Sequence, residues 1–119
     1  MRFPIIVCLA AALTACSVKV PVAVVGNNGE VMHGTATATP SAGVFEVSGP
    51  FNGKQLTCNG TYDPFDRSPQ ITIPTTCSDG RTGTVVANRD ASGMNGNGTV
   101  TLNDGATAIF VFGADAEAY

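Results

Sequence analysis

Catalysis would need a nucleophile or a paired acid and base, and the chain offers few residues for either. His33 is the one histidine, and it lies in a Thr-rich stretch between Met32 and Gly34. A Ser-His-Asp triad would have to combine it with Asp79 or Asp90, yet the chain has no Gly-x-Ser-x-Gly segment, the turn that presents a nucleophilic serine in many hydrolases. We therefore interpret His33 as a surface residue on a polar strand face, and we predict that the chain is not an enzyme.

Carboxylate and amide oxygens suggest two further kinds of site. Asp63 and Asp66 share a loop and could hydrolyse a glycosidic bond if they were held at the right separation. A later loop carries Asp90, Asn95 and Asn97, whose oxygens suit calcium, but it lacks the bidentate Glu and the spacing of an EF-hand loop. Asp and Asn in such loops ordinarily bond to their own turns. We therefore predict no metal and no cofactor.

The start of the chain has the layout of a secretory signal peptide. One positive charge, Arg2, precedes an apolar run from Phe3 to Ala12. Polar residues from Thr14 onward interrupt this run well before the roughly 20 apolar residues that a membrane span needs. Residues 1–15 are therefore too short to span a bilayer, and we expect them to be removed during export.

The segment Leu13-Thr14-Ala15-Cys16 resembles the lipobox of bacterial lipoproteins. The resemblance implies cleavage before Cys16 and attachment of lipid to that residue, and two or more acyl chains, such as palmitate, would anchor the chain stably to a membrane. It also implies residence in the outer membrane, facing the periplasm, because Ser17 replaces the Asp that retains lipoproteins in the inner membrane. The alternative is a plain secretory signal that is cut after Ala15 and releases a soluble protein.

The four cysteines separate by position once the signal is recognised. Cys8 would be discarded and Cys16 would carry lipid, which leaves Cys58 and Cys77 as an even pair in an oxidising compartment. We predict a disulfide between these two residues. Zinc is the rival ligand, but two cysteines and a single histidine do not make a four-ligand set.

Length and composition indicate one small β-domain. The mature chain would have roughly 100 residues, enough for one domain. Abundant Thr and Val favour strands, and 14 glycines with Asn-Gly and Asp-Gly pairs favour tight turns, so the composition is typical of an all-β antiparallel meander. We expect no helix after residue 16. The net charge of −3 and the lack of a basic patch argue against a nucleic-acid partner.

Alternating apolar and polar residues predict about eight short strands. Pro21 removes a ladder donor from the first of them, so we expect residues 16–29 to be an edge strand or an extended tether in front of a β-domain at 30–119. A sheet of this many strands tends to close, which predicts a closed or partly closed barrel, with an open twisted sheet or a sandwich as the alternative. The expected strands cover residues 18–25, 31–39, 44–48, 54–62, 70–76, 81–89, 98–102 and 106–112, with a break at 49–53.

One loop carries residue types that often anchor interfaces. Two aromatics and an Arg occur together there on a mostly polar chain, and a disulfide beneath the loop would keep it rigid. We predict that Tyr62, Asp63, Phe65, Asp66 and Arg67 form a binding surface. In the alternative interpretation Phe65 tucks under the loop as a core residue, and Asp63 pairs with Arg67 across the turn.

Segments 56–63 and 76–83 resemble the central signature of small uncharacterised lipoproteins of proteobacterial envelopes, which implies no particular activity. We therefore expect a non-enzymatic protein with a binding or structural role, anchored to the membrane through lipid on Cys16 and contacting another envelope protein or a cell-wall component. An inhibitor of a cell-wall hydrolase is the alternative, because small lipid-anchored β-barrels with one disulfide occur among periplasmic lysozyme inhibitors. A small hydrolase is the third hypothesis.

Overall fold

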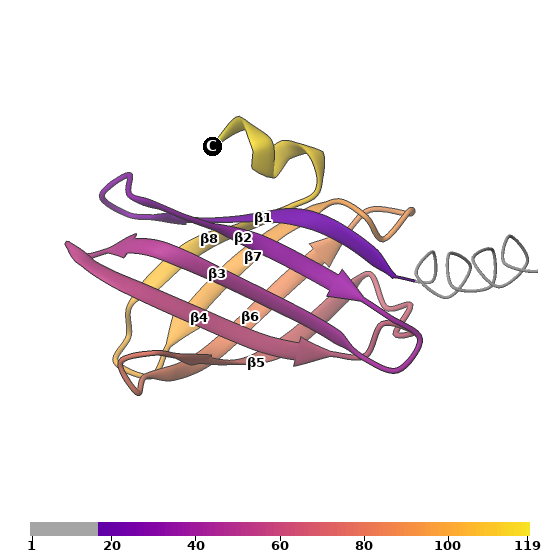
Figure 1. Ribbon diagram of the computed structural model, residues 1–119, viewed down its shortest axis with the longest axis horizontal. Helices are drawn as coiled ribbons and strands as arrows, with labels where there is room; N and C mark the ends of the chain where they lie inside the picture. Colours follow the sequence, from indigo (N-terminus) through magenta and orange to yellow (C-terminus); the bar gives the residue numbers. More distant parts are fainter. Residues whose placement is uncertain (1–16) are drawn as a thin grey trace, which may run out of the picture.

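Eight antiparallel strands, neighbours in sequence order, form a closed barrel (Figure 1). The computed structural model describes residues 17–119, so the predicted signal peptide and the lipid at Cys16 lie outside the described residues. The predicted all-β closed barrel is confirmed, and the open sheet and the sandwich are excluded. The strands are β1 (Val18–Gly26), β2 (Val31–Ala38), β3 (Gly43–Phe51), β4 (Lys54–Tyr62), β5 (Gln70–Cys77), β6 (Thr82–Arg89), β7 (Gly96–Leu102) and β8 (Thr107–Phe112).

Strand β1 closes the barrel, since it pairs with both β2 and β8. The first strand is therefore neither an edge nor a tether. Its pairing with β8 begins at Val22 opposite Phe112, one residue after Pro21. The carbonyl of Pro21 accepts a hydrogen bond from the N–H of Gly113 at 2.9 Å, just past the end of β8 at Phe112. Pro21 therefore lies where the ladder with β8 has ended, and its missing N–H costs little.

Strand β3 is longer than the sequence suggested. We expected residues 49–53 to break it, but it continues through Gly49 and Pro50 to Phe51, whose side chain is buried. The turn is formed by Asn52 and Gly53 alone. Their φ angles of 54° and 79° are both positive, as a two-residue type I′ hairpin turn requires. Pro50 is tolerated because it lies beyond the last register pair of β3 with β2.

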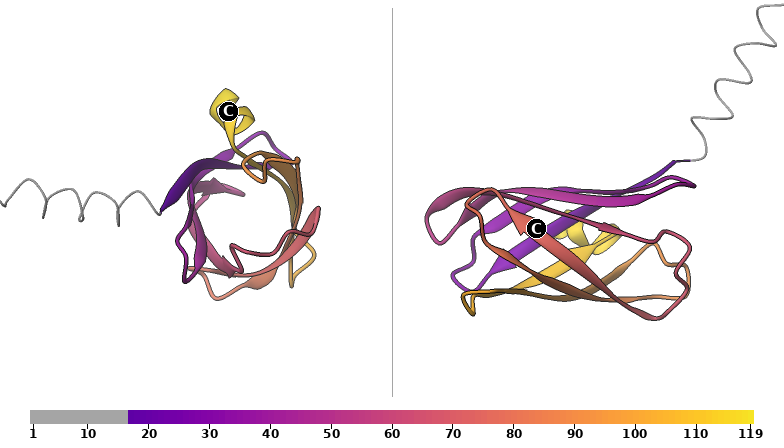
Figure 2. Two further views of the ribbon diagram at one scale, coloured as in Figure 1. Left: turned by 90° about the vertical axis from the view of Figure 1, so that its right-hand side faces the viewer. Right: turned by 90° about the horizontal axis from the view of Figure 1, so that it is seen from below.

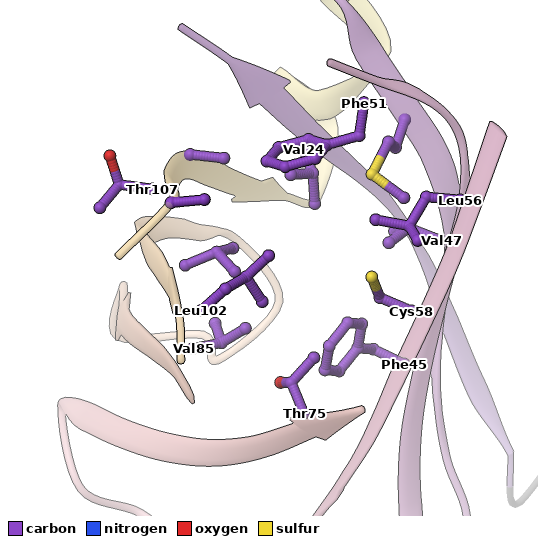
Figure 3. Close-up of a pocket in the computed structure, with 14 residues that line it drawn as sticks. Val24, Phe45, Val47, Phe51, Leu56, Cys58, Thr75, Val85, Leu102 and Thr107 are labelled. Carbon is purple, nitrogen blue, oxygen red and sulfur yellow. The ribbon is translucent and has the colours of Figure 1, made fainter. Parts of the chain in front are cut away.

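Alternate residues of each strand point into the barrel, and one half of the interior is tightly packed. Figure 3 shows apolar side chains from opposite walls converging there, Phe45, Val47 and Leu56 from one side and Val85 and Leu102 from the other. The space left between them is about 20 Å³, which is room for little more than one water molecule. This half is a hydrophobic core of the ordinary kind.

The two ends of the barrel differ. At what we name the closed end, Arg81 joins two turns by ion pairs, with Nε 2.8 Å from Oδ2 of Asp79 and Nη1 3.0 Å from Oδ2 of Asp104. Its guanidinium also lies 5.5 Å from the ring centroid of Phe51. What we name the open end carries the loops at residues 39–42, 63–69 and 90–95, together with the start of β1 and the end of β8. Figure 2 (left) looks onto the open end, where the strands form a ring.

A short helix corrects the expectation of no helix after residue 16. The 3₁₀ helix η1 (Ala114–Ala118) follows β8 and lies on the outer wall of β1 (Figure 1). Ala116 is 3% exposed and packs with Ala23 and Val111. Five residues are too few to show a helical period, which is why the sequence pattern did not reveal it. Within the described part of the chain, no helix has the length and apolarity needed to cross a membrane.

Candidate functional site

The open half of the barrel contains a cavity of about 670 Å³. This volume lies within the range of roughly 300–1,000 Å³ that is typical of ligand sites. Inward-facing residues of β1 to β6 and β8 line its walls, among them Val20, Ala36, Ile73, Ala87, Phe110 and Phe112. The loops at 63–69 and 90–95 surround its mouth. The cavity is therefore a cup with apolar walls that opens at one end of the barrel.

Two aromatic rings in edge-to-face contact form the floor of the cup. Phe45 of β3 and Phe110 of β8 meet edge to face, with ring centroids 5.3 Å apart and an interplanar angle of 82°. Phe45 is 1% exposed and lines both the cavity and the packed core beneath it. Phe112 continues the aromatic surface toward the mouth, 6.1 Å from Phe110. The floor thus separates an emptier half of the barrel from a filled one.

Glycines opposite aromatic residues keep the cup open. Gly43 faces Tyr62 across the β3–β4 pair, and Gly96 faces Phe112 across β7–β8. A Cβ atom added to Gly43 would lie 2.4 Å from the Tyr62 ring, and one added to Gly96 would lie 2.7 Å from the Phe112 ring. Each ring therefore occupies the wall space that a side chain would need, in the way that aromatic residues cover glycines in barrels.

The loop at 63–69 is built by its own aspartates. Oδ1 of Asp63 accepts a hydrogen bond from the N–H of Phe65 at 2.9 Å, and Oδ1 of Asp66 accepts one from the N–H of Ser68 at 2.9 Å. The Ser68 N–H is the main reason why the pKa of Asp66 is lowered. Both aspartates therefore have the turn-forming role that is usual for this residue.

Four of the five predicted binding residues line the cup, namely Tyr62, Phe65, Asp66 and Arg67, whereas Asp63 only shapes the loop. The alternative interpretation of the loop is wrong on both points. Phe65 is 66% exposed and does not tuck under the loop. In the described residues the ion pairs within 4 Å are those of Arg81, so Asp63 and Arg67 are not paired.

Arg89 is a cup residue that the sequence interpretation missed. Its Nη2 donates hydrogen bonds to the carbonyl oxygens of Asp66 and Ser68, and so holds the 63–69 loop from inside the barrel. Its Nε is buried and has no hydrogen-bond partner. A signal for its position did exist, because Val85, Ala87 and Arg89 follow each other at every second residue of β6 and so share the inner face.

Tyr62 lies near Arg89 on the wall of the cup. Burial raises the pKa of the Tyr62 phenol, and the positive charge of Arg89 acts weakly in the opposite direction. A phenol with a raised pKa stays protonated at neutral pH, so Tyr62 can donate a hydrogen bond to a bound molecule.

The other candidate sites from the sequence are not assembled. His33 faces outward and is exposed on β2, and Asp79 is held by Arg81 at the closed end. Asp90 accepts hydrogen bonds from Ser92 at 2.6 Å and from Asn95 at 3.2 Å, which hold its own loop together. In residues 17–119 no group of three or more His, Cys, Asp or Glu side chains is arranged to hold a metal ion.

The predicted disulfide is present just below the cup. Cys58 and Cys77 lie directly opposite each other on β4 and β5, with their sulfur atoms 2.05 Å apart. These two strands share only three register pairs, Cys58–Cys77, Asn59–Thr76 and Gly60–Thr75, and they have no further register pair between Gly60 and the mouth. The disulfide therefore fastens the barrel at the strand pair with the fewest backbone partners.

Comparison with known proteins supports the fold and leaves the family open. No protein-family model matches the chain, and no curated protein sequence matches it. A solved structure that it resembles is a de novo designed fluorescence-activating β-barrel, with a TM-score of 0.54 and 15% sequence identity over 79% of this chain and 88% of that one. At this identity the likeness concerns the barrel fold alone.

Proposed function

We propose that this chain is a lipid-anchored, non-enzymatic protein of the cell envelope that binds an apolar or amphipathic small molecule inside its barrel. The cup of about 670 Å³ at the open end is the observation that carries the proposal, because a barrel of this size could have filled its interior with side chains, as the closed half does. The lipobox resemblance at Cys16 supports anchoring, and Ser17 supports residence in the outer membrane, facing the periplasm.

The anchor and the cup would face the same surface. Strand β1 begins at Val18, and Val18 itself lines the mouth of the cup. Cys16 precedes Val18 by two residues, which span at most about 7 Å. A lipid on Cys16 would therefore hold the mouth close to the membrane, where apolar and amphipathic molecules are concentrated.

A variant that fills the cup tests this function. Ala36 lines the cavity, whereas the neighbouring Thr35 is exposed on the outer face of β2. The wild type, Ala36→Trp and the matched control Thr35→Trp should be purified in lipid particles without detergent, and their bound molecules should be extracted and identified by mass spectrometry. We expect one class of small molecule to be enriched with the wild type and Thr35→Trp, and to be lost with Ala36→Trp.

Equal extracts from all three proteins would contradict a role for the cup. The same preparations should be assayed for inhibition of lysozyme and for hydrolysis of peptidoglycan. A clear positive in either assay would favour the inhibitor or the hydrolase in place of a small-molecule binding protein.

A further inference from the structure

The cup changes character from its floor to its mouth. Its deep part is formed by Phe45, Phe110 and Ile73, which are all buried and apolar. Its mouth carries polar and charged groups, with Tyr62 and Arg89 on the walls and the loop residues around them. A cavity that is apolar at depth and polar at its opening is complementary to a molecule with a long apolar part and a polar head group.

Arg89 places a positive charge at this mouth without a carboxylate partner. Its side-chain hydrogen bonds go from Nη2 to two neutral carbonyl oxygens, and its Nε is buried without a partner. The ion pairs that occur within 4 Å in residues 17–119 involve Arg81, at the other end of the barrel. A partly buried cation without a carboxylate in direct contact is a natural partner for an anionic ligand group.

The acidic residues at the mouth form no close ion pair with Arg89. Its charge lowers the pKa of Asp66 only as the smallest of several causes, and the ion pairs within 4 Å in the described residues are those of Arg81. The carboxylate of Asp66 accepts the N–H of Ser68, and the carboxylate of Asp90 accepts hydrogen bonds from Ser92, Gly93 and Asn95. Both acids are therefore used to hold their own loops. A second cation, Arg67, also lines the mouth.

The volume of the cup limits the size of the ligand. About 670 Å³ lies within the range of sites that hold small molecules, and one long acyl chain with a small head group is a ligand of suitable size.

We propose that the ligand is a fatty acid, bound with its acyl chain toward Phe45 and Phe110 and with its carboxylate at Arg89. This inference rests on the proposed function and names the ligand class of the same cup. Tyr62 would donate a second hydrogen bond to the carboxylate. Arg89 would then connect the ligand to the 63–69 loop, because the same guanidinium holds that loop through Asp66 and Ser68.

The test compares two probes that differ only in the head group. Hexadecanoic acid and hexadecanol, each with the same photoreactive diazirine in the chain, are added to vesicles that contain the full-length lipoprotein, and cross-linked residues are identified by mass spectrometry. We expect the acid to label the cup of the wild type about tenfold more than the alcohol, since a hydrogen bond to a charged group is worth roughly 1.5–3 kcal/mol.

Charge variants locate the head group. Arg89→Gln keeps a donor for the loop carbonyls but removes the charge. The acid and the alcohol should therefore label the cup of this variant equally. Arg89→Lys should keep a preference for the acid. Lys19→Gln is the matched control, because Lys19 is an exposed cation near the same end on the outer face of β1, and it should behave as the wild type.

Each remaining outcome decides between the two proposals. Equal labelling of the wild-type cup by acid and alcohol would leave the proposed function standing and overturn the fatty-acid inference. Labelling of the cup by neither probe would overturn the proposed function itself. If the alcohol no longer labels Arg89→Gln, this variant has lost its cup. The ratio of acid to alcohol labelling in the wild type and in Arg89→Lys then decides whether the ligand is a fatty acid.

Discussion

Asp104 at the closed end accepts hydrogen bonds from the N–H of Ala106 and from Arg81, and both lower its pKa, the first more than the second. Because the pKa is lower in the folded chain, the unfolded chain binds more protons in this range, so stability rises with pH there. We predict that the free energy of unfolding falls as the pH is lowered through and below the ordinary Asp value of 3.8. Asp79, whose pKa is lowered by the N–H of Arg81, contributes in the same direction.

Denaturant unfolding at a series of pH values measures this effect. Asp104→Asn should reduce the acid-dependent loss of stability, whereas Asp115→Asn, an equal change of charge on η1, is the control. A pH dependence that is identical in wild type and Asp104→Asn would mean that neither the Ala106 N–H nor the ion pair with Arg81 stabilises the ionised carboxylate measurably, as is the case for many exposed pairs.

Cys16 is the residue on which the proposed location depends. We predict that the wild type incorporates an alkyne-labelled fatty acid in growing cells and fractionates with the outer membrane. Cys16→Ser should incorporate none and should keep its signal peptide, because the lipobox resemblance makes processing dependent on lipidation. Fully processed Cys16→Ser protein in the membrane fraction would refute the anchor.

At the scale of the strands, the β4–β5 pair depends on its disulfide. A cross-link that closes a loop of about 20 residues stabilises a chain by roughly 3 kcal/mol, and a domain of this size loses roughly 10–20 °C in Tm for that amount. We therefore predict such a loss for the double variant Cys58→Ala, Cys77→Ala or on reduction. Calorimetry measures it, and hydrogen exchange should show that the first amides to open are those of residues 61–62 and 70–74, above the last register pair.

Free thiols at both positions in protein isolated from cells with its thiols blocked would contradict this prediction. Ser78 offers a control for the strand pair itself, since its Oγ accepts the N–H of Thr57 at 3.1 Å in the same region. Ser78→Ala should cost about 1 kcal/mol and leave the opening pattern unchanged.

The glycine–aromatic pairs on the strands predict a coupled pair of mutations. Gly43→Ala should destabilise the barrel by about 1–3 kcal/mol, because its Cβ would lie 2.4 Å from the Tyr62 ring. In a Tyr62→Val background the same change should cost much less, since the ring that it displaces is gone. A double-mutant cycle of unfolding free energies measures the coupling, and additive effects of the two changes would show that the ring does not rest on Gly43.

At the scale of the whole molecule, the barrel has a defined orientation if Cys16 is lipidated. Val18, Phe65 and Met94 are exposed apolar residues at the open end, and all three line the mouth of the cup. They would lie against the bilayer, while the turns with Arg81 and Asp104 would point away from it. Figure 1 shows the two ends of the barrel on opposite sides, with the start of β1 at the right and the β7–β8 turn at the left.

The chain contains no Trp, so single Trp reporters can test the orientation. We predict that the fluorescence of Phe65→Trp is quenched by brominated phospholipids in reconstituted vesicles, and that Asn103→Trp, an exposed position at the closed end, is not quenched. Equal quenching of both reporters would show that the barrel lies on its side or tumbles on its anchor.

Much of this fold could be predicted because the signals for strands are local. Alternation placed Leu56 and Cys58 on one face of β4, and Ala108, Phe110 and Phe112 on one face of β8, and in the structure all of these are buried. The Asp-Gly pair at residues 104–105 marked the last hairpin correctly. A pair of successive residues determines a tight turn, and alternation at every second residue determines which face of a strand a side chain lies on. Both can therefore be predicted without knowledge of the rest of the chain.

Contacts between distant parts of the chain were decided only by the tertiary structure. The pairing of β1 with β8 joins the two ends of the barrel and turned an expected edge or tether into a wall. The cup exists because side chains of all eight strands meet in one half of the barrel and leave space in the other half, and the pattern of a single strand does not record this. Arg89 follows the inward face by sequence, but its pairing with the carbonyls of Asp66 and Ser68 depends on how the loop folds over the mouth. The register between distant strands and the volume of the cavity depend on the assembled barrel, whereas the inward face of a strand and the position of a tight turn depend on local sequence.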